Sequence, residues 1–98
     1  MSFFEFRSEA SDEMEQAFNY YESRRFGLGT RFIDAVMAEC HKIIQHPLIG
    51  HEHQGGGRRL NVRGFPYYIA YFIRDERIVV AAVAHASRHP DYWKDRFP

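Results

Sequence analysis

The chain has 98 residues, of which 45% are hydrophobic, 16% aromatic and 27% charged. This length predicts one domain over residues 1–98. No apolar run approaches the roughly 20 residues that a membrane span needs, and the N-terminus lacks the basic and apolar regions of a signal peptide. We therefore expect a soluble, cytoplasmic protein with no membrane partner, in which the single cysteine, Cys40, cannot form an internal disulfide.

The net charge is zero, which argues against a protein that binds nucleic acid through bulk charge. The charge is unevenly divided, however. Residues 1–50 contain five Lys and Arg against eight Asp and Glu, and residues 51–98 contain eight against five. The second half therefore carries the basic surface, which points to an anionic partner there, although a random split gives the same pattern.

The first elements are predicted from residue type and apolar spacing. Residues 3–7 are typical of a short strand with aromatic rings on both faces. Ser8 and Ser11 are both suitable N-caps for a following helix, and the acids after them suit the positive end of its dipole. An apolar stripe at spacings of three and four then predicts an amphipathic helix over residues 9–25. The stripe consists of Ala10, Met14, Ala17, Phe18 and Tyr21.

A second helix is predicted over residues 29–45. Gly27-Leu28-Gly29 interrupts the first helical pattern, and glycine after a helix can adopt the left-handed conformation that closes the last turn. Pro47 lacks an amide hydrogen and ends the second helix. The short link predicts an antiparallel helical hairpin. The new stripe consists of Phe32, Val36, Cys40 and Ile43.

The second half of the chain favours strands. Residues 47–57 contain three consecutive glycines and are predicted to be a loop. Residues 58–63, 67–74 and 77–86 then have the composition and turns of an antiparallel meander, and residues 89–96 suit one helical turn. The order β-α-α-β-β-β predicts an α+β domain in which the helical hairpin packs on one face of a small antiparallel sheet.

Three segments in this order resemble the RelE/ParE toxin superfamily, over nearly the whole chain. The last of them resembles the His-x-Ser-Arg-x-Pro-x-Tyr-Trp ending of its ParE-like branch. The segments are Tyr20-Tyr21-Glu22 with Gly27-Leu28-Gly29 and Phe32; Arg59 with Phe65-Pro66-Tyr67 and Tyr71; and His85-Ala86-Ser87-Arg88-His89-Pro90-Asp91-Tyr92-Trp93.

The resemblance implies a RelE/ParE-like fold and the toxin component of a type II toxin–antitoxin system, inactivated by a cognate antitoxin protein. It also implies one of two targets: ParE-like members poison DNA gyrase, whereas RelE-like members cut messenger RNA on the ribosome. We expect the antitoxin to occupy a groove between the helical hairpin and the sheet, because an added helix or strand buries apolar area there. Left open, such a groove favours homo-oligomers.

Metal-independent RNA cleavage needs a base, an acid and a cation for the phosphate. If the chain is a ribonuclease, the candidate catalytic residues are His85, Arg59, Arg88 and Tyr92. Histidine titrates near neutral pH, and the guanidinium of arginine binds phosphate through two hydrogen bonds. If the chain acts by binding, the candidate surface consists of Arg59, Arg63, His85, Arg88, Tyr92 and Trp93.

Each candidate also has a structural interpretation. His85 ends an apolar strand, where a histidine commonly makes a structural hydrogen bond. Arg59 and Arg63 can form the solvated side of an edge strand. Arg88 can fix the tail through an ion pair with an acid such as Asp91. The rings of Tyr92 and Trp93 can pin the tail onto the sheet by burial.

The neutral charge and the ParE-like ending favour gyrase poisoning. The alternatives are a ribosome-dependent endoribonuclease and a non-toxic binding or regulatory relative with the same fold. The resemblance disfavours the nuclease, because the chain lacks the lysine cluster of some RelE-like nucleases and its only lysines are Lys42 and Lys94. His51-Glu52-His53 lies near other histidines but lacks a recognised ligand spacing, so we predict no metal site and no cofactor.

Overall fold

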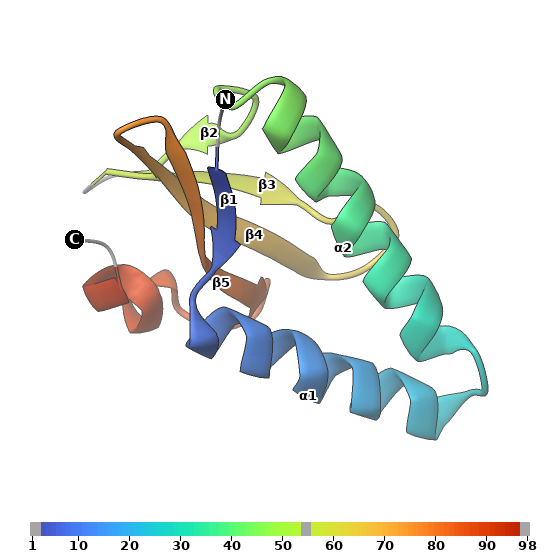
Figure 1. The fold of residues 1–98 in the computed structure, drawn as a ribbon. Coiled ribbons are helices and arrows are strands. Elements are labelled where there is room, and N and C mark those ends of the chain that lie inside the picture. The colour runs from blue at the N-terminus through green and yellow to red at the C-terminus, as the bar shows by residue number, and fades with distance from the viewer. Residues whose placement is uncertain (1–2, 54–55, 97–98) are drawn as a thin grey trace.

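The helical hairpin precedes most of the sheet, as predicted. The computed structural model describes residues 3–53 and 56–96 (Figure 1). The elements in these ranges are β1 (Phe3–Phe6), α1 (Ser8–Arg24), α2 (Leu28–Gln45), β2 (His51–Glu52), β3 (Arg58–Asn61), β4 (Tyr67–Arg74), β5 (Arg77–His85) and the 3-10 helix η1 (Pro90–Arg96). The α+β prediction is therefore confirmed.

The strands of the described ranges form one mixed sheet in the order β1-β5-β4-β3-β2. The predicted antiparallel pairing is confirmed from β3 to β5. β1, however, lies parallel to β5, with Phe3 opposite Arg77 and Phe6 opposite Val80. β2 is a correction to the predicted loop over residues 47–57, because His51 and Glu52 pair with β3. β1 pairs with a distant segment, and β2 pairs with β3 across a short loop. Local composition encodes neither pairing, because strand formation depends on the partner strand.

A β-bulge in β5 reverses which residues face the helices. The register with β4 changes from Ala70 opposite Ala82 to Tyr71 opposite Val80, so Ala81 is the extra residue. Val80 before the bulge and Val83 after it both pack in the core against the helices. Because strand side chains alternate between faces, the bulge also brings His85, two residues after Val83, to the helical side.

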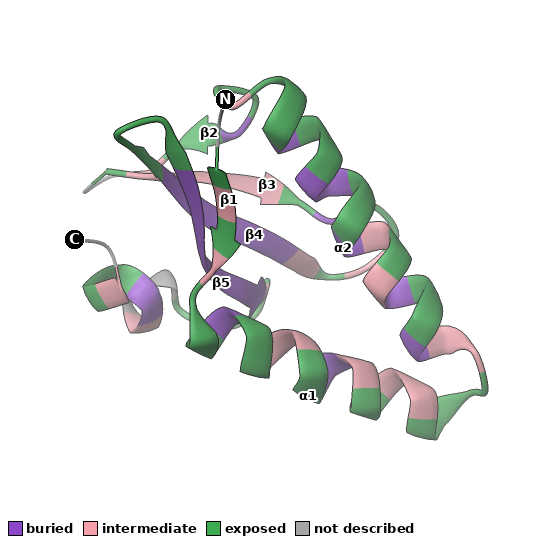
Figure 2. Cartoon of the chain, viewed as in Figure 1, coloured by how far each residue is buried: buried purple, intermediate pink, exposed green. Residues whose placement is uncertain are grey.

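The sheet is covered on both faces. α1 and α2 lie on one side, and η1 lies against the other (Figure 1). The helical side is rich in aromatic and branched side chains, and the η1 side is closed by the fully buried ring of Trp93. Burial is therefore concentrated in β4 and β5 (Figure 2). The buried residues of the η1 side that pack with Trp93 are Tyr68, Ala70, Ala82 and Ala84.

A carboxylate from the end of α1 caps the start of α2. The Glu22 side chain accepts hydrogen bonds of 2.9 Å from the backbone N–H of Gly27 and of Gly29. Gly27 has a φ of +85°, which favours glycine. At Gly29 a Cβ atom would lie 2.7 Å from the carbonyl oxygen of Phe18, so the helices approach too closely for a larger residue. These contacts explain the glutamate and the two glycines of the helix-hairpin segment.

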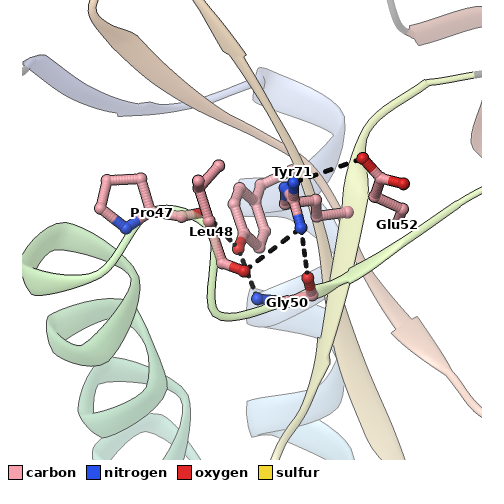
Figure 3. Close-up of polar contacts among 6 residues, drawn as sticks. Pro47, Leu48, Gly50, Glu52 and Tyr71 are labelled. Carbon is pink, nitrogen blue, oxygen red and sulfur yellow. Dashed lines mark hydrogen bonds and ion pairs between the residues drawn. The ribbon is translucent and has the colours of Figure 1, made fainter.

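Two side chains of the sheet hold the corner between α2 and β2 (Figure 3). The hydroxyl of Tyr71 accepts a hydrogen bond from the Gly50 N–H at 2.9 Å and donates one to the Pro47 carbonyl at 2.7 Å. The guanidinium of Arg58 donates to the carbonyl oxygens of Leu48 and Gly50. The loop after Pro47 is thus tied to the sheet through its backbone.

No helix within the described residues is long and apolar enough to cross a membrane. Cys40 is buried on the inner side of α2. Burial, and then the nearby charge of Glu39, raise the pKa of its thiol to about 12. The thiol therefore stays protonated and unreactive near neutral pH.

We expect Glu22→Ala to lower the free energy of unfolding by about 1–2 kcal/mol, because two N–H groups at the start of α2 lose their acceptor. Urea unfolding followed by circular dichroism measures the change. Glu15→Ala, at an exposed position of α1, is the matched control and should have little effect. Equal stability of the Glu22 variant and wild type would show that the cap contributes nothing.

We expect Tyr71→Phe to lower the free energy of unfolding by about 1–3 kcal/mol, because the Gly50 N–H and the Pro47 carbonyl both lose their partner. Tyr20→Phe is the control, since Tyr20 is 51% exposed and water can replace its hydroxyl. Chemical denaturation of both variants gives the comparison. A similar small loss in both would contradict the role of the Tyr71 hydroxyl.

Candidate functional site

A cleft of about 270 Å³ opens where α1, the end of β5 and the start of the C-terminal tail meet. It contains three of the residues that the sequence singled out, His85, Arg88 and Tyr92. α1 contributes one acidic, one amide and one phenolic side chain to its wall. The full lining is Glu13, Gln16, Ala17, Tyr20, Tyr67, Val83, His85, Arg88 and Tyr92.

His85 is oriented by the residue two positions later. Its Nδ1 atom accepts a hydrogen bond of 3.0 Å from the Ser87 backbone N–H and lies 2.7 Å from the Ser87 hydroxyl oxygen. Its ring packs edge-on against Tyr67, with 5.1 Å between centroids. Because a backbone N–H can only donate, Nδ1 is the acceptor and the neutral ring carries its proton on Nε2. In this arrangement Nε2 donates a hydrogen bond rather than accepting a proton.

The Tyr92 ring contacts two guanidinium groups. The Cζ atom of Arg88 is 3.7 Å from the centroid of the Tyr92 ring, and that of Arg96 is 5.1 Å from it. Burial, followed by the charge of Glu13 and a hydrogen bond with its carboxylate, raises the pKa of the Tyr92 phenol well above its ordinary value. The phenol therefore remains protonated at neutral pH, with its hydroxyl directed to Glu13.

Glu13 connects α1 to β5 and to η1. One of its carboxylate oxygens accepts hydrogen bonds of 3.0 Å from the Val83 N–H and from the guanidinium of Arg96. Arg96 also donates to the Ala81 carbonyl at 3.1 Å. The side chains of Glu13 and Arg96 are only 15% and 17% exposed. Glu13 thus lines the cleft, and the partly buried ion pair with Arg96 ties it to η1.

The other candidate residues lie elsewhere. Arg59 stacks on the Tyr68 ring at 3.8 Å, on the η1 side of the sheet. Arg63 follows β3 with an exposed side chain, and its N–H donates to Glu39. Trp93 is fully buried and donates from Nε1 to the Tyr68 hydroxyl at 2.7 Å. The side chain of Asp91, the suggested partner of Arg88, lies outside the described residues.

Sequence reasoning missed Glu13, Tyr67 and Arg96 as members of this site. For Glu13 a signal was available. It lies three residues after Ala10 and four before Ala17, so helical spacing puts it on the buried stripe, where a carboxylate needs a partner. The partner, Arg96, could not be identified because it is 83 residues away in the chain.

The cleft has the chemistry of a binding surface. It offers the exposed Arg88 guanidinium, the Nε2–H of His85 and tyrosine rings, and arginine and tyrosine are enriched at protein interfaces. The four proposed catalytic groups do not face one another, since Arg59 stacks on the opposite side of the sheet. Within the described residues, no group of three His, Cys, Asp or Glu side chains is arranged to hold a metal ion.

Comparison with known proteins places this fold in a family. A family model described as the ParE toxin of the type II toxin-antitoxin system parDE matches residues 4–90. No curated protein sequence matches this chain.

Two solved structures have similar folds. The chromosomal ParDE toxin–antitoxin system from P. aeruginosa contains a chain with a TM-score of 0.79 and 11% identity, over 89% of this chain and 98% of that one. The isolated E. coli RelE toxin has a TM-score of 0.67 and 19% identity, over 94% and 92%. At such low identities, the two structures show a common fold and nothing more. The family model, in contrast, matches most of the sequence and shows the family. The chain belongs to the ParE toxin family of type II toxin–antitoxin systems.

Proposed function

We propose that this chain is a toxin that inhibits growth in the cytoplasm by binding and poisoning DNA gyrase, and that a cognate antitoxin neutralises it. The observation that carries the proposal is the separation of the candidate catalytic groups. Arg59 stacks on Tyr68, on the side of the sheet away from His85. The Nδ1 atom of His85 is engaged by Ser87, and the Tyr92 phenol by Glu13. General acid–base cleavage of RNA needs such groups around one phosphate.

The target-binding surface in this proposal is the cleft between α1, β5 and the tail. Arg88 is exposed at its mouth, and the half-exposed Tyr20 lies on the α1 side. A guanidinium beside aromatic rings suits a protein surface that combines acidic and apolar groups. The zero net charge also supports a protein target, because binding to a polyanion draws mainly on accumulated positive charge.

We place the antitoxin on a second, apolar surface. A groove of about 420 Å³ lies along the helical hairpin beside β1. An amphipathic helix or an extended segment of the antitoxin would bury these side chains in a toxin–antitoxin hetero-oligomer. The solved ParDE system supports such a pair. The groove is lined by Phe6, Ser11, Met14, Glu15, Phe18, Ile33 and Met37.

The target is tested by incubating the purified chain with DNA gyrase, ATP and plasmid. We expect lost supercoiling or trapped double-strand breaks, suppressed by the antitoxin encoded beside the toxin. The same preparation is assayed for messenger RNA cleavage on ribosomes. RNA cleavage with unaffected gyrase, reduced about 10²–10⁴-fold by His85→Ala, would replace the proposal with the ribonuclease. Absence of any effect on growth would identify a non-toxic relative.

The cleft is tested with Arg88→Ala, which should weaken gyrase inhibition about 5–30-fold, as expected for loss of an interface arginine worth about 1–2 kcal/mol. Arg31→Ala, at an exposed position of α2 that does not line the cleft, is the matched control. The concentration needed for half-maximal inhibition gives the ratio. Equal potency of both variants would move the binding surface away from the cleft.

A further inference from the structure

The sheet leaves part of β5 without a neighbouring strand. β1 ends at Phe6, opposite Val80, and the chain then turns into α1. Beyond this point the backbone of β5 has no strand partner on the β1 side among the described residues. Two side chains take the place of the missing strand: Glu13 accepts from the Val83 N–H, and Arg96 donates to the Ala81 carbonyl. Glu13 and Arg96 also bond to each other, which joins α1, β5 and η1.

The same two side chains determine where the tail presents its binding groups. The Arg96 guanidinium contacts the Tyr92 ring at 5.1 Å, and Arg88 stacks on that ring at 3.7 Å. The Tyr92 phenol lies near the carboxylate of Glu13, whose charge contributes to its raised pKa. Movement of Arg96 would therefore displace Tyr92, and with it the support on which the Arg88 guanidinium rests.

We propose that Glu13 is a positioning residue, which through Arg96 fixes Tyr92 and Arg88 in the arrangement that binds the target. The role rests on the proposed function, because it takes the cleft as the target-binding surface. Glu13 does not itself need to touch the target. It acts on the C-terminal segment from a helix that is 83 residues away in the chain, through a pair whose side chains are 15% and 17% exposed.

Trp93 provides a readout that is independent of the target. It is the only tryptophan of the chain, it lies in η1, and it is fully buried against the sheet. Its fluorescence therefore reports whether η1 is docked in the folded protein. A residue that contributed only to stability would change the unfolding temperature but leave the emission of the folded state, measured well below that temperature, unchanged.

The test uses the full chain with Glu13→Gln, Arg96→Gln and both together. Each single variant should shift Trp93 emission to longer wavelength, increase its quenching by acrylamide, and weaken gyrase inhibition by about tenfold or more, as for breaking a partly buried ion pair. The double variant should inhibit gyrase about as strongly as the less potent single variant, because each change breaks the same Glu13–Arg96 ion pair. Asp12→Asn and Arg31→Gln make the same charge changes at exposed positions and should behave as wild type.

The outcomes separate this inference from the proposed function. Unchanged Trp93 emission and unchanged potency in Glu13→Gln would overturn the positioning role. A shifted emission with full potency would also overturn it, because binding would then be independent of the tail. If wild type has no effect on gyrase, the proposed function fails. Trp93 emission still decides whether Glu13 fixes the tail, and growth inhibition by the same variants decides whether that matters for toxicity.

Discussion

The arrangement of this molecule depends on how the backbone groups of β5 that β1 leaves unpaired find hydrogen-bond partners. Buried amide and carbonyl groups must find hydrogen-bond partners, and β1 supplies them only as far as Val80. Where β1 ends, α1 begins, and Glu13 in its second turn reaches the Val83 N–H. Arg96, from the C-terminal helix η1, donates a hydrogen bond to the Ala81 carbonyl on the same edge of β5. One requirement for hydrogen bonding thus brings the first helix and the last element of the described chain to the same strand, and a cleft forms where they meet.

The bulge at Ala81 determines the composition of that cleft. With regular alternation, the face of β5 that packs against the helices through Val80 would continue through Ala82 and Ala84, and His85 would lie on the η1 side. The extra residue exchanges the faces, so the small alanines accommodate Trp93 while His85 contacts Tyr67 and the helical side. The same exchange separates His85 from Arg59, which stays with Tyr68 on the η1 side. A nuclease-like set of side chains in the sequence is thereby divided between two surfaces.

Proteins that share a fold can differ in target, because the fold provides a scaffold and the side chains at its surface determine the chemistry. The RelE toxin and the ParDE system both share the scaffold of this chain. The features on which the proposed binding of gyrase rests belong to the surface: one exposed guanidinium on a tyrosine ring and a histidine whose ring is oriented by a backbone amide.

The sequence alone determined the elements whose signal is local. The periodic stripes and glycines located both helices within a few residues, since a helix is stabilised by contacts three and four positions apart. The meander likewise followed from short turns between apolar segments. Only the tertiary structure decided the parallel pairing of β1, the short strand β2, the bulge at Ala81 and the pairing of Glu13 with Arg96. The first and the last of these join segments far apart in the chain. All four depend on which backbone groups remain unsatisfied once the sheet has formed, a quantity that no local window of residues contains.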